Sequence, residues 1–349
     1  MSRRGHPHSR RPPIVDAVVR PLVRLAHRLL CPPLGVVSRL ERSRIVIFHA
    51  YPDFGRKCEA IADLLRRRGL PAVVRTGTSV LRRAIAKSSD HLWVGFWNEY
   101  PFDSLPPKYI FFNAEPLLVD RWRENAAWGR AMRGALEVWE YNRRNEAVLA
   151  AAGMAFRHVP FGFAPYYEAS FRLNTRGKAL PQDIDVLFVG SLSERREAVL
   201  CRIRNAGLRV HAVTRSNPAY GVALDELLAR SKVILSIHGF ADPQAQIPDL
   251  ARLDHPLSNR LFVVHERPAA RADYPGFEEN VTVCDYDSIP ETCAYFLSRP
   301  DERRRRAEVA GRWFASRYAL DDFIPYETLK RFIAWRPPRP EGTASGCES

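Results

Sequence analysis

The chain has 349 residues, of which 46% are hydrophobic and 11% aromatic, and it carries a formal net charge of +14. A length of this kind suits two globular domains of ordinary size. The six cysteines form no C-x-x-C pair, and no apolar run reaches the roughly 20 residues that a membrane span needs, so composition argues against a zinc finger, a disulfide scaffold and an integral membrane protein.

Residues 1–43 form a basic N-terminal extension. Residues 1–44 hold ten arginines against Asp16 and Glu41, a balance of +8. Helical spacing places the apolar residues 14, 18, 22, 25 and 29 opposite the arginines 20, 24 and 28. Such a helix would lie on an anionic membrane surface or dock on the following domain, and Pro21 counts against an uninterrupted helix. We therefore expect a cytoplasmic protein, either in solution or held peripherally at the inner face of the membrane.

Residues 44–164 alternate between predicted strands and helices. Short β-branched and aromatic runs predict strands at 44–50, 72–74, 92–96, 109–113 and 136–139. Apolar residues at helical spacing predict helices at 56–68, near 119–133 and at 142–152, with Gly69 ending the first. This alternation predicts a parallel, doubly wound sheet whose ligands bind outside the carboxyl ends of the strands.

A second array follows a predicted linker at 165–182, where proline, glycine and mixed charge interrupt the pattern. Within 183–335 we predict strands at 185–189, 208–213, 233–237, 261–264 and 281–283. Predicted helices cover 194–206, 224–230, 250–258 and stretches from about 288 onward, and residues 336–349 read as a disordered tail. The predicted fold class is therefore α/β, with two Rossmann-like, doubly wound domains.

The segment D-V-L-F-V-G-S-L-S-E-R-R-E, residues 185–197, is typical of a phosphate-binding turn. Gly190 would allow close approach of the backbone, and Ser191 with Glu194 would form a capping box at the helix start. Arg195 and Arg196 add positive charge beside it. The alternative is an ordinary strand-to-helix turn with solvated arginines.

A second polar segment is R-L-D-H-P-L-S-N-R-L-F-V-V-H-E-R-P, residues 252–268, in which a polar helix leads into a buried strand. At the carboxyl end of that strand Glu266 would bind ribose or sugar hydroxyls, and Arg252, His255 or Arg260 would meet phosphate. The alternative is surface charge on a helix followed by a loop whose polar groups bond to one another.

These segments, taken in order, resemble a known family. V-P-F-G-F at 159–163, the two segments above and D-E-R-R-R-R-A-E-V-A-G-R-W-F-A-S-R-Y at 301–318 resemble the C-terminal half of group-one-like GT-B glycosyltransferases, with the CgeB-like bacterial branch nearest. Y-I-F-F-N-A-E-P at 109–116 and V-W-E-Y-N-R-R-N at 138–145 look like segments of the same broad group. The likeness covers roughly residues 44–334.

The resemblance implies two domains that face each other across a cleft. The C-terminal domain would hold a nucleotide-diphosphate sugar, which is a co-substrate, and no further cofactor is implied. The N-terminal domain would present a glycan, lipid-linked or other acceptor. Carried over by position, the diphosphate would meet Gly190, Ser191 and Arg195 or Arg196, and the nucleotide would meet Arg252, Asp254, His255 and Asn259.

One departure bears on mechanism. Retaining members of the family often carry two glutamates separated by seven residues, and here Ile247 and His255 occupy those positions. Their absence favours an inverting enzyme or lost activity. Inversion requires a general base in the first domain, for which His49 and Glu115 are candidates at predicted strand ends, although each would serve equally as a loop residue bonded to backbone.

Three functional hypotheses remain open at this point. The first is a nucleotide-sugar glycosyltransferase for which we expect no metal requirement. The second is a catalytically silent GT-B-like module that binds a nucleotide or glycan in surface-glycan assembly. A nucleic-acid-associated protein ranks lower, because the basic residues are not interleaved with stacking aromatic side chains.

Overall fold

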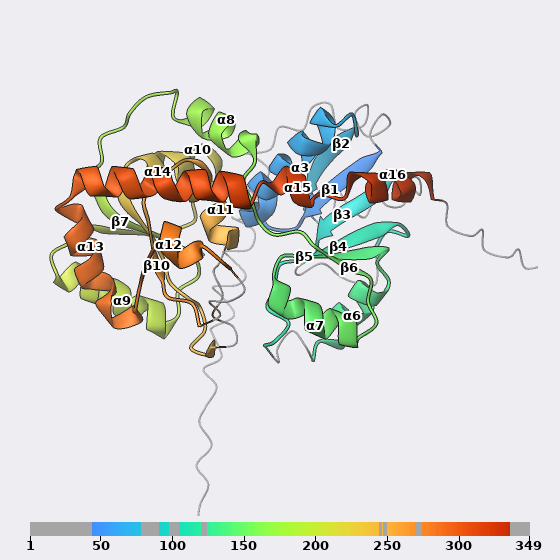
Figure 1. Cartoon of the computed structure of the whole chain (residues 1–349), viewed down its shortest axis with the longest axis horizontal. Helices are drawn as coiled ribbons and strands as arrows, with labels where there is room; N and C mark the ends of the chain where they lie inside the picture. The colour runs from blue at the N-terminus through green and yellow to red at the C-terminus, as the bar shows by residue number, and fades with distance from the viewer. Residues whose placement is uncertain are drawn as a thin grey trace, which may run out of the picture. The chain divides into compact units, whose positions relative to one another are not determined.

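The computed structural model describes residues 44–77, 91–97, 105–119, 124–243, 246, 250–269 and 274–335, which carry two successive α/β halves (Figure 1). The predicted amphipathic helix of the N-terminal extension and the predicted tail at 336–349 lie outside the described residues. So does Ile247.

The first half contains a parallel sheet with the strand order β2-β1-β3-β4-β5-β6 among the described residues. Its strands are β1 (Ile45–His49), β2 (Ala72–Thr76), β3 (Leu92–Phe96), β4 (Tyr109–Asn113), β5 (Glu137–Glu140) and β6 (Phe156–His158). β1, β3 and β4 are buried along their whole length, as continuous apolar runs in a parallel sheet should be. The sequence predicted all of these strands except β6.

Helices cover both faces of this sheet. α3 (Gly55–Arg67) follows the short 3-10 turn η1 (Pro52–Phe54) and packs on one face, while α6 (Ala126–Arg133) and α7 (Arg143–Ala151) pack on the other (Figure 1). α3 ends before Gly69, whose φ is +74°, as its sequence predicted. α6 begins at Ala126, where Asn125 caps it by accepting from Trp128 N, and residues 120–123 of the helix predicted near 119–133 lie outside the described residues.

Residues 165–182, predicted as a linker, contain the helix α8 (Pro165–Asn174). The N–H groups of the first turn have no partner within a helix, so a proline, which lacks this group, is tolerated there. Pro165 is therefore compatible with the start of a helix. After α8 the chain turns at Arg176 and Gly177, both with positive φ, and enters the second half.

The second half contains a parallel sheet with the order β11-β10-β9-β7-β8 among the described residues. Its strands are β7 (Ile184–Val189), β8 (Val210–Val213), β9 (Ser231–Ser236), β10 (Val263–Glu266) and β11 (Thr282–Cys284). The helices after its strands are α9 (Glu194–Asn205), α10 (Gly221–Ala229), α11 (Leu250–Ser258), α12 (Phe277–Asn280), η4 (Tyr286–Ser288) and α13 (Ile289–Leu297). The sequence did not predict α12.

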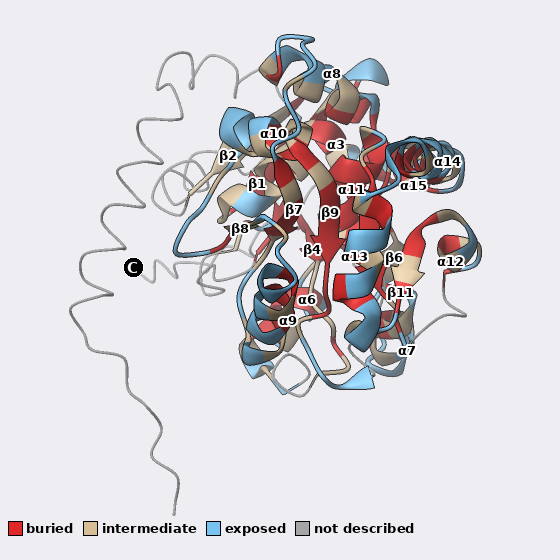
Figure 2. Cartoon of the chain, turned by 90° about the vertical axis from the view of Figure 1, so that its left-hand side faces the viewer, coloured by how far each residue is buried: buried red, intermediate tan, exposed pale blue. Residues whose placement is uncertain are grey.

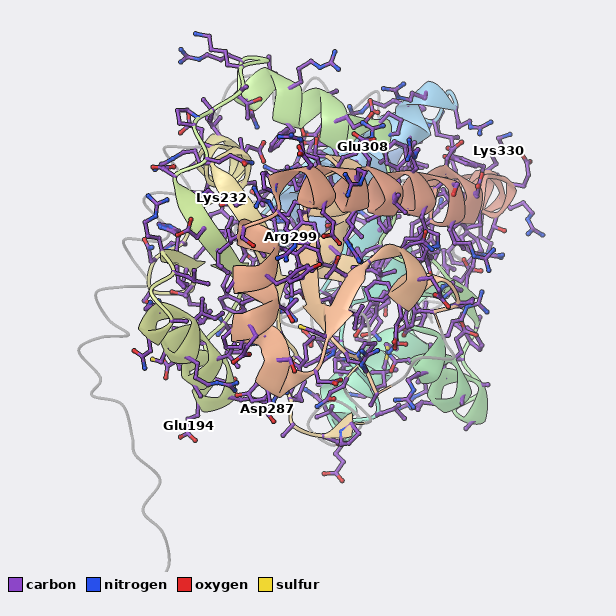
Figure 3. The ribbon with its side chains drawn as sticks, turned by 60° about the vertical axis from the view of Figure 1, so that its left-hand side comes forward. Glu194, Lys232, Asp287, Arg299, Glu308 and Lys330 are labelled. Atoms are coloured by element: carbon purple, nitrogen blue, oxygen red, sulfur yellow. The ribbon has the colours of Figure 1, made fainter. Side chains whose placement is uncertain are left out.

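Alternation along the central strand explains why helices pack on both faces. Val186 and Phe188 of β7 enter the apolar cluster formed with α9 and α13, whereas Leu187 enters the cluster formed with α10 and α11. Figure 2 shows β7 and β9 buried between helices whose exposed sides point outward. Charged side chains such as Glu194 and Arg299 are exposed on that outer surface (Figure 3).

The end of the chain returns to the first half. α14 (Pro300–Arg317) leads into α15 (Leu320–Phe323) and α16 (Tyr326–Ala334). Phe163 N donates to Tyr318 O at 2.7 Å and Leu320 N donates to Phe163 O at 2.8 Å. The buried Lys108 Nζ donates to Ile333 O and to Trp335 O, each at 2.9 Å. These bonds join the C-terminal segment to the first sheet.

Candidate functional site

The two sheets each have one point where the chain reverses its direction of winding. In the first sheet that point lies between β1 and β3, and in the second it lies between β7 and β9. Loops at the carboxyl ends of strands part at such a point and leave a crevice for ligands. His49 ends β1, Gly190 follows β7 and His238 follows β9. Of these three residues, the sequence had also singled out His49 and Gly190, but not His238.

Gly190 forms the turn between β7 and α9. Its φ is +154°, and a Cβ atom there would lie 3.2 Å from Arg252 Nη1 and 3.3 Å from Phe188 Cζ. A side chain would be strained and crowded at this position. The predicted capping box with Ser191 is wrong, because α9 begins at Glu194 and its cap is Ser193, whose hydroxyl accepts from Arg196 N at 3.4 Å.

Arg196 is buried inside the turn and bonds to its backbone. Its side chain is only 5% exposed. Its Nε and Nη2 donate to Ile237 O at 3.1 and 2.8 Å, and its Nη1 donates to Ser191 O at 2.8 Å. Arg196 thus ties the loop after β7 to the loop after β9, across the reversal point of the sheet.

Arg195 and Glu266, predicted separately as phosphate and hydroxyl ligands, are paired with each other. Arg195 Nη1 donates to Glu266 Oε2 at 2.7 Å, and its Nη2 bonds the other carboxylate oxygen. Glu266 also accepts from His238 N at 2.9 Å. The Arg195 guanidinium lies over the ring of Tyr286, 3.9 Å from its centroid, and Tyr286 OH donates to Arg195 O at 2.7 Å. This bidentate pair fixes the edge of the site.

α11 presents its residues in different directions. Arg252, near its start, reaches Gly190. Asp254 is buried and accepts from Lys57 Nζ of α3 at 2.8 and 3.1 Å and from Tyr167 OH of α8 at 2.8 Å. Arg260 follows the helix, has a φ of +51° and pairs with Glu168 at 3.1 Å.

His255 lies in a buried ion-pair network with its ring bonded to α10. Its Nε2 is 2.8 Å from Asp225 Oδ1, and Asp225 also pairs with Arg56 Nη1 at 2.8 Å. Burial lowers the pKa of His255, against the hydrogen bond to Asp225 that raises it. Asn259 Nδ2 donates to His255 O at 2.9 Å. Asp254, His255 and Asn259 therefore hold elements of the structure together.

The structure thus divides the predicted residues of the second half into two groups. Those gathered at the reversal point of the sheet are Gly190, Ser191, Arg195, Arg196, Arg252 and Glu266. Those placed in contacts among α3, α8, α10 and α14 are Asp254, His255, Asn259 and Arg260.

The two candidate bases of the first half differ in exposure. His49 is 2% exposed, its Nδ1 bonds Tyr51 O, and a Cβ on Gly55 would lie 3.3 Å from its ring. Glu115, after β4, is partly exposed. Its backbone is held by Asn113 and Asn145, whose Nδ2 atoms each donate to Glu115 O at 2.9 Å.

Glu140, the last residue of β5, is a polar residue that the sequence patterns did not indicate as part of a site. Its side chain is 0% exposed, and it accepts from Asn113 Nδ2 at 2.7 Å and from Asn145 Nδ2 and Asn142 N at 2.9 Å. Burial raises its pKa to about 8, although the three hydrogen bonds oppose that shift. The available signal was a glutamate at the end of a buried strand, followed within five residues by two asparagines.

We expect this buried carboxyl group to make stability depend on pH. The folded-state pKa of Glu140 lies above the ordinary value of 4.5. The contribution of this group to the free energy of unfolding is therefore fully present below pH 4.5 and is lost as pH rises through about 8. Glu140→Gln stays neutral, so its free energy of unfolding should lack this fall, which approaches ~1.4 kcal/mol per pH unit. Denaturant unfolding from pH 5 to pH 8.5 measures the free energy of unfolding of both proteins. The same pH dependence in wild type and variant would contradict the prediction.

The partners of Asp254 and His255, which are Lys57, Asp225 and through Asp225 also Arg56, were likewise not predicted from the sequence. The signal for the two cations was their position in G-R-K-C at the start of a helix that packs on the core.

Among the described residues there is no group of three or more His, Cys, Asp or Glu side chains suited to holding a metal ion. Within the same residues, each helix is too short or too polar to cross a membrane.

Comparison with known proteins identified neighbours by structure alone. No protein-family model matches the sequence, and no curated protein matches it. WaaG, a glycosyltransferase involved in lipopolysaccharide biosynthesis, has a TM-score of 0.51 at 15% identity, covering 82% of this chain and 99% of WaaG. Sucrose-phosphate synthase from Thermosynechococcus elongatus has a TM-score of 0.49 at 10% identity, covering 84% of this chain and 100% of the synthase. Two parallel α/β halves together with the likeness to WaaG show that the chain has the GT-B glycosyltransferase fold.

Proposed function

We propose that the protein is a glycosyltransferase that moves a sugar from a nucleotide-diphosphate donor to a glycan, lipid-linked or other acceptor. Its GT-B fold, shared with the glycosyltransferase WaaG, supports the proposal. The observation that carries it is the turn at Gly190, where a backbone position without a side chain lies beside the guanidinium of Arg252 at the reversal point of the second sheet.

The charges around this turn suit a diphosphate. The side chain of Arg196 donates its hydrogen bonds to backbone carbonyl groups, and Arg195 forms a salt bridge with Glu266. We assign the phosphate contact to Arg252, helped by the N–H groups at the start of α9. Arg195 and Arg196 would then shape the turn. These groups would also stabilise the diphosphate as it departs, without a metal ion.

For the acceptor side, Glu115 is the better candidate for the general base. It follows β4 at the carboxyl edge of the first sheet and is partly exposed, whereas His49 is enclosed beneath the start of α3. A base must come within hydrogen-bond reach of the acceptor hydroxyl, which requires an accessible carboxylate. An inverting transfer follows from this assignment.

The catalytically silent module is the alternative that a specific observation favours. His255 stands where retaining members of the family that the sequence resembles often carry a glutamate, and its ring is held in the buried pair with Asp225. A protein without that glutamate would bind a nucleotide or a glycan and transfer nothing. Donor turnover separates the two hypotheses.

The proposal can be tested by measuring thermal unfolding with one nucleoside diphosphate at a time and then titrating the protein with those that stabilise it. A ligand at 100 times its Kd should stabilise the fold by about 2.7 kcal/mol. Gly190→Ala should weaken that binding at least about tenfold, equivalent to ~1.4 kcal/mol, because its Cβ would crowd Arg252.

The matched control is Gly207→Ala beyond the other end of α9, where φ is +82° and no atom lies within 4 Å of the added Cβ. It should bind like the wild type. Binding with donor hydrolysis or sugar transfer supports the enzyme, binding without turnover supports the silent module, and no binding of any diphosphate overturns both nucleotide hypotheses.

A further inference from the structure

A buried polar frame at the carboxyl ends of β4 and β5 consists of Glu140 and the side chains of Asn113, Asn142 and Asn145. Glu140 is fully buried, and the donors placed around its two oxygens are two asparagine amides and one backbone N–H. Burying a carboxyl group costs free energy that a buried apolar side chain would not. Such a cost is typical of groups that serve a site.

The frame connects Glu140 to Glu115. Asn113 Nδ2 donates to Glu140 Oε2 at 2.7 Å and to Glu115 O at 2.9 Å. Asn145 Nδ2 donates to Glu140 Oε1 and to Glu115 O, both at 2.9 Å. Each amide nitrogen has two N–H donors, so both are fully used. Two amide groups thus bridge the buried carboxylate and the peptide of the proposed base.

The carboxylate also decides which way the two amides point. In its ionised form, which exists above the pKa of about 8, Glu140 only accepts hydrogen bonds, so it turns the amide nitrogens toward itself and the amide oxygens away. Asn113 Oδ1 then accepts from Glu115 N at 3.3 Å, and Asn145 Oδ1 accepts from Leu117 N at 2.9 Å. Four hydrogen bonds consequently hold the backbone of residues 115–117.

We propose that Glu140 is a positioning residue for Glu115, acting through the two asparagine amides that bridge the two glutamates. The inference rests on the proposed function, in which Glu115 is the general base. A base displaced by about 1 Å loses much of its effect, so a frame that fixes its peptide contributes directly to turnover. Glu140 itself does not touch the substrate.

The second half of the chain contacts the same frame. Asn142 N donates to Glu140 Oε1 at 2.9 Å, and Asn142 Oδ1 accepts from Tyr274 OH at 3.4 Å. Asn142 Oδ1 also caps α7 by accepting from Arg144 N at 3.0 Å. The frame is therefore attached both to the helix behind it and to the half that carries the Gly190 turn.

Glu140→Gln tests the proposal, because glutamine has the same shape but presents an N–H group to one of the amide donors. Above pH 8, where a carboxyl group with a pKa of about 8 is ionised, we expect kcat to fall roughly tenfold to a hundredfold, with the Kd for a nucleoside diphosphate unchanged. Glu137→Gln is the matched control, since Glu137 is a buried glutamate on the same strand that pairs with Arg157 at 3.0 Å. It should keep wild-type kcat.

A double-mutant cycle separates positioning from general loss of structure. In a Glu115→Gln background, Glu140→Gln should reduce kcat little further, because its effect acts through the missing base. Full additivity would overturn the proposal. The pH profile gives a second reading, since protonating Glu140 places an O–H against a donor. The negative charge of Glu146 on α7 raises the pKa of Glu140 further. The kcat of the wild type should therefore rise as pH passes about 8, and this rise should be absent from Glu140→Gln.

If Glu140→Gln does not fold, Asn145→Ala removes one of the two bridges and should show the same loss of kcat at constant Kd. Wild-type kcat in either folded variant would overturn the positioning role and leave the proposed function intact. A wild-type protein that binds no diphosphate and transfers no sugar would overturn the proposed function itself.

Discussion

Replacing Glu115 with glutamine is expected to lower kcat roughly a hundredfold or more, the usual contribution of a general base. The amide keeps the size of the side chain but cannot take the proton of the acceptor hydroxyl. Because Glu115 lies in the first half and Gly190 in the second, the Kd for a nucleoside diphosphate should not change. Initial rates of sugar transfer and calorimetric titration give the two quantities.

His49→Gln is the comparison for this variant. His49 is enclosed and bonded to Tyr51 O, so we expect its substitution to change thermal stability more than turnover. A large loss of kcat in His49→Gln, with Glu115→Gln unaffected, would transfer the role of base to the histidine. Wild-type turnover in both variants would favour a retaining route without such a base.

Removing the carboxylate of Asp225 is expected to cost about 3–5 kcal/mol of the free energy of unfolding, as breaking a buried ion pair does. Asp225 is 0% exposed and pairs with Arg56 and with the ring of His255, each at 2.8 Å. Asp225→Ala would leave the buried ring of His255 and the guanidinium of Arg56, whose side chain is 15% exposed, without their shared acceptor. Denaturant unfolding measures the loss, and a cost below 1 kcal/mol would contradict the argument.

Asp183→Ala provides the control for that experiment. Asp183 pairs with Arg230 on the surface, where the two side chains are 48% and 41% exposed. Exposed pairs contribute about 0–1 kcal/mol, because water and salt screen them. The contrast between the two aspartates therefore measures burial. Asp225 joins α10 to α3 through Arg56 and to α11 through His255, so its loss should also loosen contacts between the two halves.

The sequence by itself determined most strands and the doubly wound class of both halves. Strands buried on two faces must be continuous apolar runs, and β1, β3 and β4 stand out for that reason. It also located the turn at Gly190, since a glycine between a strand and a helix is a local signal. β6 reads F-R-H and α12 reads F-E-E-N, so neither contains an apolar run, whereas the equally short β11 was predicted from the β-branched run V-T-V.

Only the tertiary structure decided the partners of the charged residues. Lys57 and Asp254 are 197 positions apart in the sequence, and Arg195 and Glu266 are 71 apart. No local pattern tells whether such a residue will bind a ligand or another residue. The side chains of α11 show the difference, because Arg252 reaches the Gly190 turn while Asp254 and His255 are buried against other helices. The face that a helix residue presents depends on what packs around the helix, and that is settled only when the chain has folded.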